Sequence, residues 1–130
     1  MGLEIVSSTI VKCEAKYGAG IHFDKSNSEV LMKGLNVSYC FSTNGNGGGL
    51  YLEGTGGGNE HVTILETTFH ANRASGFGGA ISADRSNRYL TIAGCNITQN
   101  FAQLSGIDSL IFVVLILLLV GVTIAYSRIF

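Results

Sequence analysis

One pattern occurs four times between residues 3 and 107 of this 130-residue chain, and it constrains the fold more than any other feature. Each copy opens with a short alternating strand, Leu3-Glu4-Ile5, Leu35-Asn36-Val37, Val62-Thr63-Ile64 or Leu90-Thr91-Ile92. A second apolar residue follows after a turn, at Ile10, Phe41, Phe69 or Ile97, and then comes a small-residue cluster that leads into another strand, such as GAGIHF, GGGLYL or GGAISA. Regular recurrence of one unit every 27 to 32 residues indicates a repeat architecture, in which units bury their apolar faces against each other.

The contents of the repeat favour β structure over helical repeats. The apolar residues alternate in runs of three or four, are rich in β-branched types, and are interrupted by Gly and Asn. We therefore predict an all-β fold, a right-handed parallel β-helix of about four coils at residues 3–29, 30–60, 61–88 and 89–107, forming one domain at 1–107. Stacked coils would align two interior ladders, Ile5-Val37-Ile64-Ile92 and Ile21-Leu50-Ile81-Ile107.

Glycine and asparagine have structural roles in this fold. The Gly clusters fit sharp bends that need φ > 0 or leave no space for a Cβ. Three residues after the second apolar position stand Cys13, Asn44, Asn72 and Asn100. Because Asn tolerates the left-handed region and its amide can bond the next coil, Asn44, Asn72 and Asn100 are expected to form a structural ladder.

The three cysteines depend on how coil two is aligned. Their number and spacing fit neither a disulfide scaffold nor a zinc site. With Val37 aligned on Ile5, Cys13 lies in the Asn column, Cys40 lies in a turn, and no disulfide follows. With coil two aligned on Met32 and Val37 instead, Cys40 stacks on Cys13, close enough to bond.

An uncharged apolar run at residues 110–126 predicts a single transmembrane helix within a C-terminal segment at 108–130. A small domain has no interior that could surround a helix apolar on every face. Asp108 before the run and Arg128 after it favour a cytoplasmic C-terminus, and a glycolipid-anchor signal is the competing interpretation. Since no secretory signal precedes the first coil, we expect a natural protein that is longer at its N-terminus, or one inserted by its tail.

The segments FHANRASGFGGAIS at 69–82 and FSTNGNGGGLYL at 41–52 carry a family resemblance. They resemble the FxxN and GGA[ILV] repeats of chlamydial polymorphic outer-membrane proteins and related right-handed β-helix proteins, over residues 3–107. The resemblance implies the β-helix fold and a role as an adhesin. Those bacterial proteins end in a β-barrel, whereas the apolar run here implies a single-pass surface protein.

Three acidic residues follow the Gly-led strands at matching positions, Asp24, Glu53 and Asp84. Stacked carboxylates repel unless they are bridged, so this column is a weak calcium candidate. Ordinary turn chemistry, with Lys25 and Arg85 as neutralising partners, is the stronger interpretation, and no cofactor is predicted.

Catalysis is not expected from the pattern. His22, Tyr51 and Ser82 take the outward position of their strands, and we expect no acidic pair beside them. His61 and His70 have no nucleophile or acid placed by spacing, and are interpreted as surface residues. Asn36 and Asn96 begin Asn-x-Ser/Thr sequons, face outward, and are glycosylation candidates if the repeats are lumenal.

These observations predict a single-pass membrane protein that displays a β-helix outside the cell for adhesion or recognition, with an extracellular protein or carbohydrate as partner. The net charge of -1 gives no footprint for nucleic acid. Two alternatives remain open: a fragment of a carbohydrate-processing β-helix enzyme, and a tail-anchored protein whose repeats face the cytosol.

Overall fold

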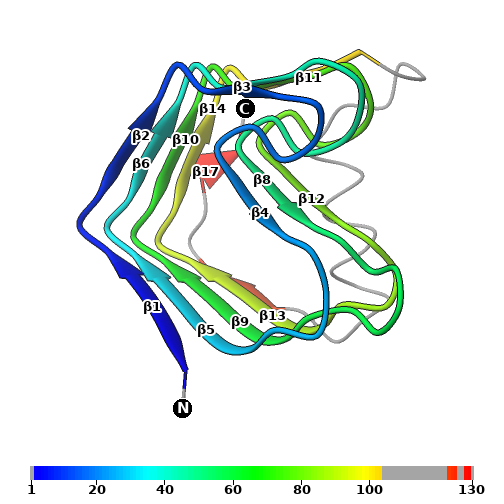
Figure 1. Ribbon diagram of the computed structural model, residues 1–130. Helices are drawn as coiled ribbons and strands as arrows, with labels where there is room; N and C mark the ends of the chain where they lie inside the picture. The colour runs from blue at the N-terminus through cyan, green and yellow to red at the C-terminus, as the bar shows by residue number, and fades with distance from the viewer. Residues whose placement is uncertain (1, 104–122, 126–127, 130) are drawn as a thin grey trace.

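The computed structural model describes residues 2–103, 123–125 and 128–129, and it folds them as a parallel β-solenoid of about four coils (Figure 1). Among these residues, four strands make each of the first three coils, and the described part of the fourth coil has three. The strands are β1 (Leu3–Val6), β2 (Thr9–Val11), β3 (Glu14–Ala15) and β4 (Ile21–Phe23) in coil one; β5 (Ser28–Lys33), β6 (Asn36–Ser38), β7 (Phe41–Ser42) and β8 (Leu50–Leu52) in coil two; β9 (Glu60–Leu65), β10 (Thr68–His70), β11 (Arg73–Ala74) and β12 (Ile81–Ala83) in coil three; and β13 (Arg88–Ala93), β14 (Asn96–Thr98) and β15 (Phe101–Ala102) in coil four.

Equivalent strands of successive coils pair in parallel and build four sheets along the solenoid. The first sheet has the order β1-β5-β9-β13-β16 and the second β2-β6-β10-β14-β17, where β16 is Thr123–Ala125 and β17 is Arg128–Ile129. The third sheet has the order β3-β7-β11-β15, and the fourth β4-β8-β12. Parallel pairing of every coil confirms the predicted all-β repeat class.

The alignment of coil two is the alternative one, and the ladder that places Val37 beside Ile5 is wrong. Met32 pairs with Ile5 and Ile64, while Val37 pairs with Ile10 and Phe69. Two inward ladders result, Ile5-Met32-Ile64-Ile92 and Ile10-Val37-Phe69-Ile97. This register keeps the two ladders five positions apart in every coil, and it moves most of the extra residues of coil two into the loop at 53–59.

The core fills the space between the sheets with side chains from all coils. Its fully buried members include Met32, Ile64 and Phe69. The expected ladder on the fourth sheet is confirmed for Ile21, Leu50 and Ile81, whereas its expected fourth member at position 107 lies outside the described residues. Each added coil removes apolar surface from water, which stabilises the stack by about 25 cal/mol per Å².

Single residues in the left-handed conformation turn the chain between sheets. The corner between the second and third sheets uses Lys12, Tyr39, Ala71 and Gln99, all with φ of 53–56°. The corner between the first and second sheets uses Ser7, Gly34, Glu66 and Gly94. The predicted glycine bends therefore account for only part of the turning, because stacking forces a positive φ on ordinary residues at the same corners.

An asparagine ladder follows one of these corners, with a corrected membership. Asn72 accepts the Cys40 N–H through Oδ1 (3.0 Å), and its Nδ2 donates to Asn100 Oδ1 (3.0 Å). Asn72 and Asn100 are thus confirmed as ladder residues. Asn44 is not a member, because the register of coil two places Cys40 at that position and leaves Asn44 exposed in a loop.

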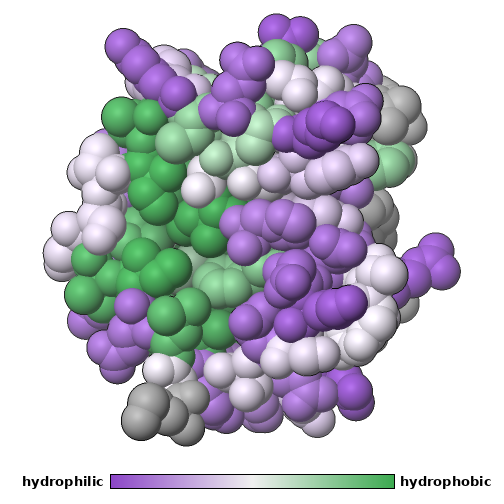
Figure 2. All heavy atoms as spheres, viewed as in Figure 1, coloured by the Kyte–Doolittle hydropathy of each residue, from purple (hydrophilic) through white to green (hydrophobic). Residues whose placement is uncertain are grey.

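The first coil of the described residues leaves several apolar side chains exposed. Leu3, Val6 and Val11 are each more than two-fifths exposed, and Ile5 and Ile10 are only partly buried. Figure 2 shows hydrophobic side chains gathered on the side of this end that carries β1 and β2. Among the described residues, only coil two covers these side chains, whereas coils two and three are covered from both sides.

Most of the predicted transmembrane helix falls at 104–122, outside the described residues, and the helix stays a prediction. Three residues at the end of the apolar run form β16, which pairs with β13. None of the residues that the structure describes belongs to a helix able to cross a membrane.

Candidate binding site on the outer face of the fourth sheet

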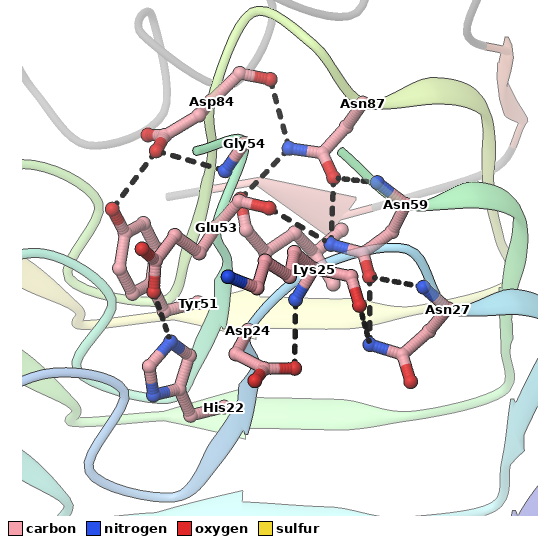
Figure 3. Close-up of polar contacts among 11 residues, drawn as sticks. His22, Asp24, Lys25, Asn27, Tyr51, Glu53, Gly54, Asn59, Asp84 and Asn87 are labelled. Carbon is pink, nitrogen blue, oxygen red and sulfur yellow. Dashed lines mark hydrogen bonds and ion pairs between the residues drawn. The ribbon is translucent and has the colours of Figure 1, made fainter. Parts of the chain in front are cut away.

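The strands of the fourth sheet bring one polar cluster together. His22 of β4, Tyr51 of β8 and Ser82 of β12 are register partners on the outer face of this sheet. Each of these strands is followed directly by an acidic residue: Asp24 after β4, Glu53 after β8 and Asp84 after β12 (Figure 3). The cluster therefore joins residues that lie about thirty positions apart in the sequence.

His22 and Tyr51 each have an acidic partner, so the expectation that no acidic pair joins this face is wrong. Its imidazole Nε2 lies 3.0 Å from Glu53 Oε2, with about a third of each side chain exposed. The same ring stacks on Tyr51, with 5.1 Å between centroids and 19° between planes. Glu53 belongs to the next coil, one residue beyond its strand, and turns back along the sheet to reach the histidine.

Tyr51 forms a second pair with a carboxylate, in a more buried setting. Its hydroxyl donates to Asp84 Oδ2 (2.9 Å), and the same oxygen accepts the N–H of Gly54 (3.0 Å). Burial, and then the hydrogen bond to Asp84, raise the pKa of Tyr51 far above its usual range. The phenol therefore stays protonated and holds Asp84 as an acceptor.

Ser82 completes the face with an unused polar atom. Its side chain is fully buried beside Tyr51, and its Oγ is the buried side-chain oxygen that has no hydrogen-bond partner within the described part of the chain. Buried hydroxyls are normally paired, so this one is an exception among the described side chains, and its burial closes it off from a ligand at the surface of the sheet.

The acidic column aligns in register, but its carboxylates point to different partners. Asp24 accepts from the backbone N–H of Lys25 (2.7 Å), Glu53 bonds His22, and Asp84 bonds Tyr51. Among the residues with described placement, no group of three possible metal ligands converges. The arrangement therefore supports hydrogen bonding better than the calcium site considered from the sequence.

A second asparagine ladder lies behind the cluster and positions its acidic residues. Asn59 Nδ2 donates to the Glu53 carbonyl (3.0 Å), and Asn87 Nδ2 donates to the Asp84 carbonyl (2.8 Å). The two amides bond each other (2.8 Å), and Asn27 donates to Asn59 (2.9 Å). The matching DKSN and DRSN segments were the available sequence signal, which the Gly-rich insertion before Asn59 hid in coil two.

The remaining histidines lie elsewhere on the surface. His61 is exposed and stacks on Tyr89, with 4.7 Å between ring centroids. His70 is half-buried, bonds Thr98 Oγ1 (2.9 Å) and meets the edge of Tyr39. Neither joins the polar cluster on the fourth sheet.

Both sequon asparagines are exposed, as expected. Asn36 and Asn96 occupy one outward column of the second sheet, with Thr68 of the intervening coil between them. Asn36 Oδ1 accepts from the hydroxyl of Ser38, a residue of the same sequon. Both sites are thus open to an enzyme that adds a glycan.

The cluster offers an aromatic stack and two carboxylate acceptors on a parallel sheet. Such a set can bind a ligand rich in hydroxyl groups, since carboxylates accept strong hydrogen bonds and aromatic rings pack against C–H faces. Comparison with protein families, curated proteins and solved structures found no match to this chain. Function must accordingly be argued from the site itself.

Proposed function

We propose that this chain is a recognition unit of a surface-displayed right-handed parallel β-helix, tethered by a membrane helix at residues 110–126, and that it binds carbohydrate on the fourth sheet. The observation that carries the proposal is the stacked His22–Tyr51 pair, with each ring hydrogen-bonded to a carboxylate.

The geometry favours a hydroxyl-rich ligand over an anionic one. Glu53 and Asp84 would repel an anion, and among the described residues no arginine or lysine side chain bonds to either carboxylate. One oxygen of each carboxylate already has a partner, which fixes the group and leaves its other oxygen to accept a sugar hydroxyl. The partly exposed His22 ring supplies an apolar face beside these acceptors.

Binding of the full-length protein to an array of immobilised glycans tests this proposal. Glu53→Gln and His22→Ala should each reduce binding about tenfold or more, since a lost charge-assisted bond is worth roughly 1.5–3 kcal/mol. His61→Ala is the matched control, because His61 also stacks on a tyrosine but lies on another sheet. Equal losses in the control and the two cluster variants would refute the site.

The membrane tether and the outward placement need separate measurements in cells. Resistance of the full chain to alkaline extraction supports a transmembrane helix, whereas release by alkali assigns the tail to the solenoid, as the pairing of β16 with β13 suggests. A mobility shift on glycosidase treatment that disappears in the Asn36→Gln, Asn96→Gln double variant supports a lumenal solenoid. Unmodified sequons in membrane-integrated protein favour the cytosolic alternative.

A second candidate function is carbohydrate processing, and a specific feature favours it. Glu53 and Asp84 are neighbours in adjacent coils, with one bonded to an imidazole and the other to a phenol. Acid–base cleavage of glycosides uses two carboxylates in different environments. Release of new reducing ends from a glycan that the wild-type protein binds, lost in Glu53→Gln while binding persists, would select this function over recognition alone.

A further inference from the structure

Cys13 and Cys40 occupy the same place in the first two coils, at the corner between the second and third sheets. The residues on both sides of them are register partners, Val11 with Ser38 and Glu14 with Phe41. The N–H of Phe41 donates to the Cys13 carbonyl (2.8 Å), which fixes the two cysteines side by side. Neighbouring parallel strands lie about 4.8 Å apart, within the range of roughly 4.4–6.8 Å that disulfides span between Cα atoms.

The two cysteines continue the column of the asparagine ladder: coils one and two have Cys13 and Cys40 at the position where coils three and four have asparagine. Asn72 accepts the Cys40 N–H, but Cys40 has no amide to accept the N–H of Cys13 in the same way. The Cys40 thiol instead donates to the Ile10 carbonyl of the first coil (3.7 Å) and to the Ser38 carbonyl of its own coil (3.5 Å). The column thus holds two cysteines in adjacent coils, where coils three and four hold two asparagines.

The third cysteine lies at a different corner, away from Cys13 and Cys40. Cys95 is buried at the corner between the first and second sheets, and its thiol contacts the carbonyls of Ile64 and Ala93. Cys13 is half-buried and Cys40 is fully buried. A reagent from solution therefore meets Cys13 first.

We propose that oxidation joins Cys13 and Cys40 in a disulfide that fastens the first coil to the second. The thiolate of Cys13 attacks a small-molecule disulfide, forms a mixed disulfide and releases one small thiol. Cys40 then loses its proton and attacks the Cys13 sulfur, so that the S–S bond forms and the second small thiol leaves. The protein loses two hydrogen atoms, and the small disulfide is reduced to two thiols.

The bond would link the first two coils of the described residues at one corner. Ile5 and Ile10 of this first coil are only partly buried, and within the described residues β1, β2 and β3 each pair with a strand of coil two. A covalent link from β2–β3 to β6–β7 keeps these strands from separating from the stack. The inference stands on the register of the two coils and is independent of the carbohydrate proposal.

Alkylation and intact-mass measurement of the full chain test the inference. After equilibration with oxidised and reduced glutathione and then denaturation, the protein should accept one alkyl group, on Cys95, instead of three. Proteolysis should yield one linked peptide pair that contains Cys13 and Cys40. Cys95→Ser should keep the link, and this variant then accepts no alkyl group.

Other results would contradict the proposed disulfide. Three alkylated thiols after oxidation, or a linked pair that includes Cys95, overturn the inference. In Cys40→Ser, glutathione should remain attached to Cys13, because no second thiol displaces it. Hydrogen exchange of the wild-type protein gives an independent check: oxidation should slow exchange in β1–β3 and leave β9–β11 unchanged, and unchanged exchange in β1–β3 contradicts the fastening role.

Discussion

Replacing Asn72 by alanine should be among the most damaging changes of a single polar side chain in the solenoid. The side chain is buried, accepts the Cys40 N–H at 3.0 Å, and donates to the Val37 carbonyl at 2.8 Å and to Asn100 at 3.0 Å. Alanine leaves the Cys40 N–H and the Val37 carbonyl buried without these partners. At about 1–3 kcal/mol for each orphaned group, the free energy of unfolding should fall by roughly 3 kcal/mol.

Urea unfolding of the full chain in detergent, followed by circular dichroism, measures this loss. Asn44→Ala is the matched control, because Asn44 is exposed in a loop and its removal should cost less than about 0.5 kcal/mol. If Asn44→Ala costs as much as Asn72→Ala, coil two has the other register. A loss below about 1 kcal/mol for Asn72→Ala would mean that the amide ladder is not what secures this corner.

Three further outcomes are expected. Phe69→Ala removes a fully buried ring and should cost about 3–5 kcal/mol in urea unfolding, whereas Phe101→Ala, at a ring that is 55% exposed, should cost less than about 1 kcal/mol. Gly48→Ala would place a Cβ 2.4 Å from the Gly79 carbonyl oxygen, so thermal unfolding should show a loss of roughly 2–3 kcal/mol. Tyr51→Phe should delete the ionisation seen at highest pH in a tyrosinate absorbance titration. Because the folded pKa of Tyr51 is raised, its contribution to stability is complete below about pH 10 and declines at higher pH; wild-type stability independent of pH there contradicts this assignment.

The repeat and its β character were predictable because both rest on local patterns. Alternation of apolar residues sets which side chains face inward, and regular recurrence requires stacking. Coil two shows the limit of this reasoning. Met32 and Val37 each end a short alternating run, so either could continue the ladder of Ile5. Only the pairing of whole coils decides which of the two residues joins that ladder, since the register must satisfy both inward ladders at once.

The polar cluster on the fourth sheet was even less predictable from the sequence than the register of coil two. His22 and Glu53 are 31 residues apart, and nothing near either one indicates a partner. The stacking of coils brings them to 3.0 Å, and the second asparagine ladder fixes the turns that aim the acidic residues. Side-chain direction beyond a strand end depends on turn geometry, which hydrophobic periodicity does not encode.

The sequence by itself therefore determined a stack of β coils, its inward residues on three of the four coils, and an apolar tail, because these follow from periodicity and composition. The tertiary structure decided the register of coil two, the meeting of Cys13 with Cys40, and the pairing of His22 with Glu53. Each of these joins residues from different coils. Contacts between coils depend on loop lengths and on burial summed over the whole stack, and no local segment carries that information.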